Sequence, residues 1–229
     1  MRIVILCAGE ASRWGGHLGR PKHLLPINGE PILHRTVRLL RELRPDADVY
    51  IAARPEDLAD YTVPGAVTFE ADLQPARFDA DKFLSSLRYW AERGDTVLLY
   101  GDCFFTRDAL ATITSQPPVQ DWELFARFSG SAITGSQWPE CFAFRLSHAF
   151  QERFVHVGEE LVEAYARRLL RRIGGWEFYA ALSGQDPTSP AVFGEYACAI
   201  DDWTEDFDTP AEFSAWSERM VMEGATHVL

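Results

Sequence analysis

A glycine-rich segment with three cationic residues, residues 8–33 (AGEASRWGGHLGRPKHLLPINGEPIL), follows directly on the first apolar run of the chain. Arg13, Arg20 and Lys22 are spaced along it. Glycine allows backbone N–H groups to approach a phosphate closely, and those amides act as fixed donors. Arg13 could bind two phosphate oxygens at once, and Lys22, which follows a proline, could place a point charge on a third. The segment therefore has the composition of a phosphate-binding loop.

Two familiar phosphate-binding loops do not fit this segment. The Walker loop requires Gly-Lys followed by Ser or Thr, and that tripeptide is absent from the sequence. The dinucleotide fingerprint requires three glycines in a short turn that enters a helix at once. Here the loop is longer, and Ala11 stands where a second glycine would follow Gly9.

Short apolar runs rich in β-branched residues alternate with helical patterns in the first half of the chain. The runs predict buried strands at 2–8, 48–53, 66–71 and 96–101. Helical spacing of apolar residues predicts helices over 31–43 and 79–93. Strands that alternate with helices imply right-handed crossovers, so we predict an α/β fold with a mostly parallel sheet flanked by helices.

The second half of the chain has a different pattern. Strands are predicted at 122–128, 140–146 and 196–200, and the segment 147–183 is predominantly helical. Thr209 begins a capping-box sequence with proline at the first helical position, which predicts a final helix to about residue 223. We predict one domain over residues 1–229.

Composition limits the classes of partner and compartment. The chain has 229 residues, of which 47% are hydrophobic and 13% aromatic, enough for the core of one large domain. A net charge of −12 and a pI near 4.9 argue against nucleic acid or an anionic membrane as a partner. The four cysteines contain no Cys-x-x-Cys pair and read as reduced packing residues. No apolar stretch approaches the length of a membrane span, and we expect a cytoplasmic protein.

The sequence from Leu6 to Leu33 resembles the signature of the nucleotidyltransferases that share the nucleotide-diphospho-sugar transferase fold. In words, that signature is Leu-x-Ala-Gly-x-Gly-x-Arg, a spacer, Pro-Lys, a few apolar residues, and Gly-x-Pro-x-Leu/Ile. The family includes sugar-1-phosphate nucleotidyltransferases, cytidylyltransferases for polyol phosphates and sugar acids, and MobA-like molybdopterin guanylyltransferases. The resemblance implies a Rossmann-like fold with a mixed sheet, a nucleotide-binding half over 1–120, and an acceptor-binding half over 121–229 with a helical insert at 147–183.

The resemblance also implies roles for the first loop. The residues expected to wrap the triphosphate are Ala8, Gly9, Glu10, Ala11, Ser12 and Arg13. Lys22 would neutralise charge near the α-phosphate, so Arg13 and Lys22 are the expected catalytic residues. The family's second glycine is Ala11 here, where a left-handed backbone would cost about 1 kcal/mol. Glu10 would be unfavourable beside a triphosphate unless it points away or faces a cation.

Members of the family hold Mg²⁺ with one aspartate after the fourth strand and another late in the chain. Asp102 fits the first place, and Asp208, in a segment similar to the family's Asp-Thr-Pro-Glu-Asp motif, fits the second, with Asp206 as an alternative. Two carboxylates about 4 Å apart repel by roughly 4 kcal/mol at an effective dielectric near 20, so the acid-rich segment 201–208 favours a cation. Alternatively, Asp102 ends a strand in a turn, and Asp208 only precedes a helix N-terminus.

The base and acceptor sites are less clearly marked. The resemblance implies that a small polar residue contacts the base and that this residue lies in the helix after the third strand. Ser85 and Ser86 are therefore candidates. Alternatively, they are solvent-facing helix serines. Arg127 and Arg145, on or near strands, could bind an acceptor phosphate. The aromatic residues that could stack on a base are Trp14, Trp90, Tyr100 and Trp138. The arginine-rich run 167–172 reads as a solvated helix face.

We therefore predict a Mg²⁺-dependent nucleotidyltransferase that joins a nucleoside triphosphate to a small phosphorylated acceptor, with a sugar-1-phosphate favoured. Asp102 would contact the nucleotide as well as the metal. Two alternatives stay open: a glycosyltransferase of the same fold that uses a nucleotide-sugar, and a nucleotide-binding module without catalysis. The apolar residues of 147–183 could cover the active site or form the interface of a homodimer.

Overall fold

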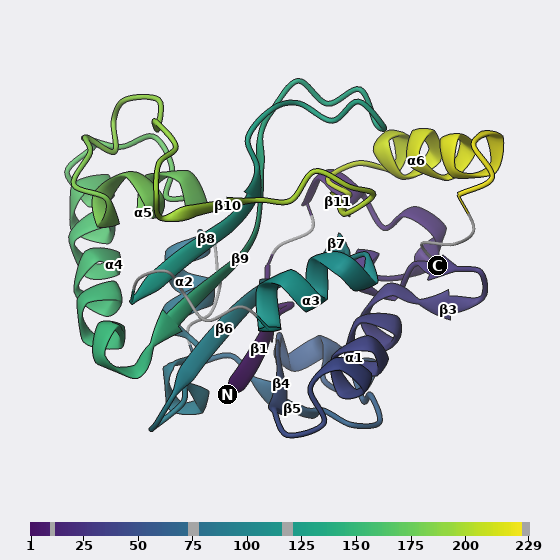
Figure 1. The fold of residues 1–229 in the computed structure, drawn as a ribbon, viewed down its shortest axis with the longest axis horizontal. Helices are drawn as coiled ribbons and strands as arrows, with labels where there is room; N and C mark the ends of the chain where they lie inside the picture. The colour runs from purple at the N-terminus through teal and green to yellow at the C-terminus, as the bar shows by residue number, and fades with distance from the viewer. Residues whose placement is uncertain (10–11, 73–77, 116–120, 226–229) are drawn as a thin grey trace.

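The computed structural model describes residues 1–9, 12–72, 78–115 and 121–225, which contain a seven-stranded mixed sheet (Figure 1). The strand order across it is β10-β8-β9-β6-β1-β4-β5. The strands are β1 (Arg2–Leu6), β4 (Asp48–Ala53), β5 (Val67–Glu70), β6 (Asp95–Tyr100), β8 (Trp122–Arg127), β9 (Glu140–Ser147) and β10 (Ala197–Ala199). β1 pairs in parallel with β4 and β6, and β9 runs antiparallel between β6 and β8.

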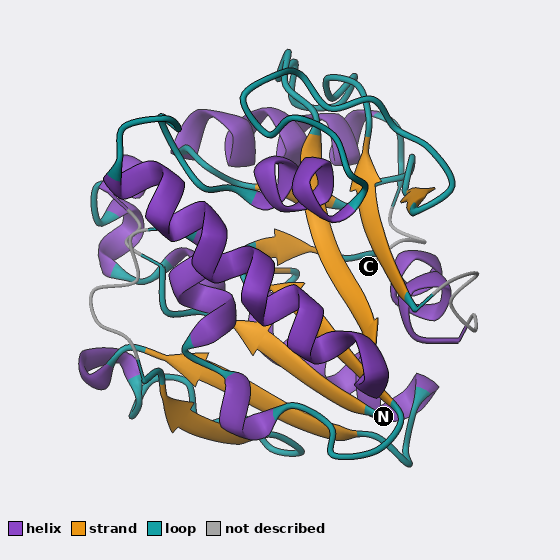
Figure 2. Ribbon diagram, turned by 90° about the vertical axis from the view of Figure 1, so that its left-hand side faces the viewer, coloured by secondary structure: helices purple, strands orange, loops and turns teal. Residues whose placement is uncertain are grey.

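Helices cover both faces of the sheet, as Figures 1 and 2 show. They are α1 (Ile32–Leu43), α2 (Asp79–Leu84), α3 (Arg107–Ser115), α4 (Gln151–Ala166), α5 (Gly175–Leu182) and α6 (Pro210–Met222). α1 and α3 contact each other on one side, while α4 contacts α2 and α5 on the other. Two-residue strands form two small ladders, β2 (Pro26–Ile27) with β3 (Glu30–Pro31), and β7 (Cys103–Phe104) with β11 (Glu205–Asp206). No helix within the described ranges is long and apolar enough to cross a bilayer.

The core lies between the sheet and its helices because the central strands are apolar on both faces. Ile3, Val4 and Ile5 of β1 are fully buried. α4 contributes Phe154 and Val157, which are also fully buried against the sheet. The predicted α/β class and mixed, mostly parallel sheet are confirmed, and all seven predicted strands are present.

Two predicted helical stretches differ in detail from the structure, and one helix was not predicted. The helix expected over 79–93 stops at Leu84, because the side chains of Ser85 and Ser86 donate hydrogen bonds to backbone carbonyls one turn back; a 3₁₀ turn follows. The stretch 147–183 contains α4 and α5 with an irregular link between them. α3 lies in a segment for which no element was predicted.

A second, smaller apolar cluster joins the first loop to the end of the chain. Trp14 lies in it with Phe104, Phe207 and Trp216, and each of these four side chains is almost completely buried. α6 begins with the predicted capping box: the Thr209 side chain accepts from the Glu212 backbone N–H, and Glu212 accepts from the Thr209 backbone N–H at 2.8 Å. This cluster therefore fixes the segment before α6 against the loop that follows β1.

Gly101, directly before Asp102, is a position where the chain has no room for a side chain. A Cβ at Gly101 would overlap the Cys7 Sγ and stand 2.9 Å from the Leu6 carbonyl oxygen. We expect Gly101→Ala to lower the free energy of unfolding by about 3 kcal/mol, because it overpacks two neighbouring strands. Urea unfolding checks this, with Gly194→Ala as control, where the nearest atom to a Cβ is 3.8 Å away. Equal stability of the two variants would contradict the prediction.

Candidate active site

The candidate site is centred on Lys22 at the carboxyl ends of β1 and β6. These strands are parallel neighbours, so the loops that follow them meet at one edge of the sheet. A 3₁₀ turn at Lys22–Leu24 buries the lysine, whose side chain is only 9% exposed. Its Nζ lies 2.6 Å from the Asp102 carboxylate. The first loop and the fourth strand of the sheet in sequence order therefore supply the two halves of an ion pair.

The late acidic segment reaches the same point through the ladder of β7 and β11. Asp206 pairs with Cys103 in that ladder, which places its carboxylate 3.8 Å from Lys22 Nζ. Asp208 lies at the same 3.8 Å from Lys22 and forms a 2.5 Å ion pair with Arg13. The structure thus brings together Arg13, Lys22 and three aspartates that the sequence separates by nearly the whole chain.

The charges in this cluster are strongly coupled. Burial alone would lower the pKa of Lys22, but the carboxylates of Asp102, Asp206 and Asp208 outweigh it, so the pKa lies above its usual value and the lysine stays charged. Burial would raise the pKa of Asp102, but Lys22 and Lys82 hold it below its usual range. Burial and the Asp102 carboxylate raise the pKa of Asp206. Three carboxylates therefore lie within 3.8 Å of one buried ammonium, that of Lys22.

The donor set in this cluster suits a hard divalent cation. Among the described residues, Asp102, Cys103 and Asp206 offer ligand atoms within 4.8 Å of one another. Within the part of the chain that the structure describes, the buried Oδ1 of Asp206 has no hydrogen-bond partner. Burial raises the pKa of the Cys103 thiol, and Mg²⁺ prefers oxygen, so the two carboxylates fit the ion and the thiol does not. The geometry groups Asp206 with Asp102, whereas Asp208, expected to be the main partner of Asp102, is engaged by Arg13.

A cavity of about 880 Å³ extends from this cluster along the carboxyl edge of the sheet. Gly9 and Lys22 line it. Residues of the α5 N-terminus and of the segment 187–193, including Trp176 and Phe193, also line it. Its size is within the range of small-molecule sites. The volume therefore leaves room for two small molecules side by side.

The remaining residues of the predicted triphosphate loop are only partly described. Gly9 lines the cavity, and Ala8 is buried beside it. Glu10 and Ala11 lie outside the described residues, as does the side chain of Ser12.

The residues predicted for the base and acceptor sites lie elsewhere in the fold. Ser85 and Ser86 are fully buried and bonded to their own helix, and neither lines the cavity. Arg127 forms a 2.6 Å ion pair with Glu205, and Arg145 pairs with Asp95 at 2.5 Å. Both arginines are buried away from the cavity lining. Of the four candidate stacking aromatics, Tyr100 and Trp138 line the cavity, whereas Trp14 and Trp90 are buried in the apolar clusters.

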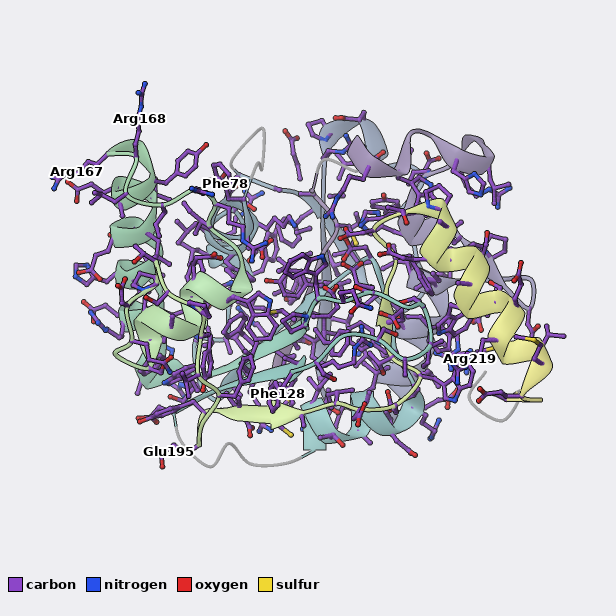
Figure 3. All side chains as sticks on the ribbon, turned by 90° about the horizontal axis from the view of Figure 1, so that it is seen from above. Phe78, Phe128, Arg167, Arg168, Glu195 and Arg219 are labelled. Atoms are coloured by element: carbon purple, nitrogen blue, oxygen red, sulfur yellow. The ribbon has the colours of Figure 1, made fainter. Side chains whose placement is uncertain are left out.

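Several residues of the cavity were not singled out from the sequence. Asp79 and Lys82 of α2 line it, and so does Arg172 from the arginine-rich run. Arg167 and Arg168 of the same run are exposed and point away from the molecule in Figure 3, as a solvated face would. The run 167–172 lies in the irregular link between α4 and α5 and not on a helix face as expected, so helical periodicity offered no signal for Arg172.

His23, next to Lys22, gives the site a predicted pH dependence of stability. It is buried and shares a 2.7 Å hydrogen bond with the Tyr61 hydroxyl. Burial lowers its pKa from 6.5 to about 4, so the unfolded chain binds the proton more readily. The free energy of unfolding therefore has its full value above pH 6.5. As the pH falls to 4, this histidine lowers it by about 3 kcal/mol in all. Urea unfolding between pH 7.5 and 4 should show a shallower decline for His23→Gln; parallel curves for the two proteins would contradict this.

Comparison of the sequence with known proteins gives one family and one relative. Residues 3–176 match the family model that describes the MobA-like NTP transferase domain. Bifunctional protein GlmU of Chromobacterium violaceum is 31% identical over 107 residues, which make up 47% of this chain. The matched segment spans 23% of that relative's length.

Three solved structures share the fold over nearly their whole length. The nucleoside-diphosphate-sugar pyrophosphorylase of Vibrio cholerae RC9 has a TM-score of 0.64 at 14% identity, covering 94% of this chain and 99% of that one. Rv0371c of Mycobacterium tuberculosis H37Rv has a TM-score of 0.57 at 16% identity, covering 95% and 96%. The inositol-1-phosphate CTP transferase of T. maritima has a TM-score of 0.56 at 13% identity, covering 96% and 95%. The predicted nucleotidyltransferase fold is confirmed.

Proposed function

Because the chain belongs to the MobA-like NTP transferase family, we propose that it transfers a nucleoside monophosphate group from a nucleoside triphosphate to a phosphorylated acceptor. The observation that carries this proposal is the convergence of Lys22 and Arg13, from the first loop, on Asp102, Asp206 and Asp208 in the lining of a cavity with room for two small molecules. A cationic pair beside carboxylates suits a triphosphate and its counter-ion.

In the proposed reaction, an oxygen of the acceptor phosphate forms a bond to the α-phosphorus of the triphosphate. The bond from that phosphorus to the bridging oxygen of the β-phosphate breaks, and pyrophosphate leaves with the electron pair. The acceptor phosphate is already ionised at neutral pH, so no proton has to be removed. Catalysis then consists of positioning and charge stabilisation.

The residues of the site divide these tasks. Lys22, held charged by its carboxylates, would neutralise the charge that develops at the α-phosphate. Arg13, whose side chain is 67% exposed and pairs with Asp208, would bind the outer phosphates. Asp102 and Asp206 would hold Mg²⁺, with Asp208 beside them; when bound, the ion supplies charge neutralisation at the phosphate oxygens.

A sugar-1-phosphate is the acceptor that we favour. Two of the structures that share the fold are described as a nucleoside-diphosphate-sugar pyrophosphorylase and an inositol-1-phosphate CTP transferase. The cavity lining includes two aromatic side chains, Trp176 and Phe193, and the guanidinium of Arg172. Such a wall suits a ring that carries a phosphate.

The proposal is tested by a pyrophosphate-release screen that crosses four nucleoside triphosphates with sugar-1-phosphates and polyol phosphates. Each pair is assayed with Mg²⁺ and with a chelator. Release that depends on Mg²⁺ and on one pair of substrates is the expected result, and the products identify both substrates. Absence of release from every pair, together with thermal stabilisation by a nucleotide-sugar, would contradict the proposal and favour a glycosyltransferase.

A further inference from the structure

Lysine is rare in this chain, and its positions are informative. It occupies only two of the 22 Lys and Arg positions, Lys22 and Lys82, and both line the same cavity. Arginine serves at every other cationic position, including the exposed helix faces. A lysine ammonium is a compact point charge that can bind a single phosphate oxygen, whereas an arginine guanidinium binds two oxygens at once. The second lysine is therefore a candidate for ligand binding, although nothing in the proposed reaction so far uses it.

Lys82 lies against the start of the first loop. Its side chain, from the middle of α2, is 19% exposed. A Cβ at Gly9 would stand 3.0 Å from the Lys82 Cε and 3.4 Å from its Nζ. Gly9 therefore leaves the space into which the lysine extends, and this contact places the ammonium beside the start of the loop that follows β1.

Asp79 holds the ammonium in place. Its Oδ1 accepts from Lys82 Nζ at 2.9 Å. Its Oδ2 accepts from the Tyr100 hydroxyl at 2.7 Å and from the Gly175 backbone N–H at 2.8 Å. Because β6 and α5 both fix this carboxylate, the lysine is aimed by three elements of the fold.

The charge of Lys82 is less fully matched by carboxylates than that of Lys22. Lys22 forms ion pairs with Asp102, Asp206 and Asp208. Lys82 forms one, with Asp79, among the described residues. An ammonium has three donors, so Lys82 can bind a further anionic oxygen without leaving Asp79.

We propose that Lys82 is a second nucleotide-binding lysine, which binds a phosphate oxygen of the nucleoside triphosphate at the loop that begins with Gly9. This inference rests on the proposed function, which supplies the triphosphate. Asp79 is its positioning residue, and Tyr100 and Gly175 fix Asp79.

The test is nucleotide binding measured by calorimetry, with Mg²⁺ and the triphosphate that the unaltered protein prefers. Lys82→Met should raise the Kd for the triphosphate by about 10- to 100-fold, the usual effect of losing a charged hydrogen bond. Binding of the matching nucleoside, measured by competition, should be unchanged, since it has no phosphate. The acceptor KM at saturating triphosphate should also stay within about threefold of its original value.

Two further variants separate binding from folding. Lys82→Met leaves the Asp79 carboxylate without its cation, so the double variant with Asp79→Asn removes both charges while the amide can still accept from Tyr100 and Gly175. It should show the same loss of affinity. Arg145→Met, which breaks a buried ion pair with Asp95 outside the cavity lining, should keep the original Kd.

The outcomes distinguish this inference from the proposed function. An unchanged Kd with a raised acceptor KM would place Lys82 at the acceptor and overturn the inference alone. Equal losses for nucleoside and triphosphate would show a contact with the base or ribose and would also overturn it. Failure of the unaltered protein to bind any nucleoside triphosphate would overturn both the proposed function and the inference.

Discussion

Replacement of Lys22 by methionine is expected to lower kcat/KM for nucleotidyl transfer by roughly 1,000-fold, the upper end of what loss of one charge-stabilising donor costs. Lys22 is the cation that Asp102, Asp206 and Asp208 share, and it is the buried positive charge next to the proposed α-phosphate position. Without it, the developing charge loses its partner and the carboxylates repel the triphosphate. Pyrophosphate release over a range of both substrates measures the loss.

A structural collapse would also reduce activity, so the Lys22 variant needs its own control. Arg145→Met removes a cation that is equally buried, from an ion pair with Asp95 at a distance from the cavity lining. It should lose stability and keep kcat/KM for the fraction that is folded, as measured by circular dichroism. A loss below about tenfold for Lys22→Met would remove this lysine from the proposed mechanism.

Asp102→Asn should lower kcat by roughly 100-fold or more and raise the Mg²⁺ concentration needed for half-maximal activity. An amide keeps the shape of the side chain but gives up the charge that attracts the cation and that pairs with Lys22 at 2.6 Å. Loss of a residue that only contacts a metal ligand lowers metal affinity or activity by about 10- to 100-fold. Asp102 is proposed as a direct ligand, so its loss should cost at least as much. The Mg²⁺ titration of pyrophosphate release measures both effects.

The acidic segment itself provides a matched control for the Asp102 variant. Asp201 is exposed and lies in the same run of carboxylates as Asp206. Asp201→Asn removes one negative charge from that run and should leave both kcat and the Mg²⁺ requirement unchanged. If the two variants behaved alike, the Mg²⁺ dependence would come from the general negative charge of the segment and not from a specific metal site.

The sheet and the loop at its edge were predictable because their signals are local. Apolar runs such as that of β1 are buried on both faces, and a strand buried in this way can be recognised without its partners. Parallel strands end at one edge, so a loop after the first and an aspartate after the fourth both lie at that edge. This explains why Lys22 and Asp102 could be placed in one site from the sequence, whereas their ion pair is a finding of the structure.

The rest of the site depends on contacts that leave no local pattern. Asp206 reaches Lys22 through a two-residue ladder with Cys103, which is too short for any periodicity. Ser86 looked exposed because it is polar, but it satisfies its hydroxyl within α2 and receives the Trp90 indole N–H. Arg127 was a candidate for binding a ligand, but it forms an ion pair with the buried carboxylate of Glu205. For Asp206 and Arg127 a partner distant in sequence decided the outcome, whereas Ser86 is satisfied by near neighbours.

The contacts between the first loop and the segment before α6 affect the order in which the protein folds during synthesis. Lys22 Nζ donates to the Phe207 carbonyl at 3.4 Å across 185 residues, and Trp14 and Trp216 share one apolar cluster. During synthesis, the neighbouring strands β1, β4 and β6 can pair long before residue 207 leaves the ribosome. A nascent chain arrested at residue 200 should therefore hold its first strands in place yet fail to bind nucleotide. The contacts of the site should then form last in folding, because they join residues far apart in the sequence.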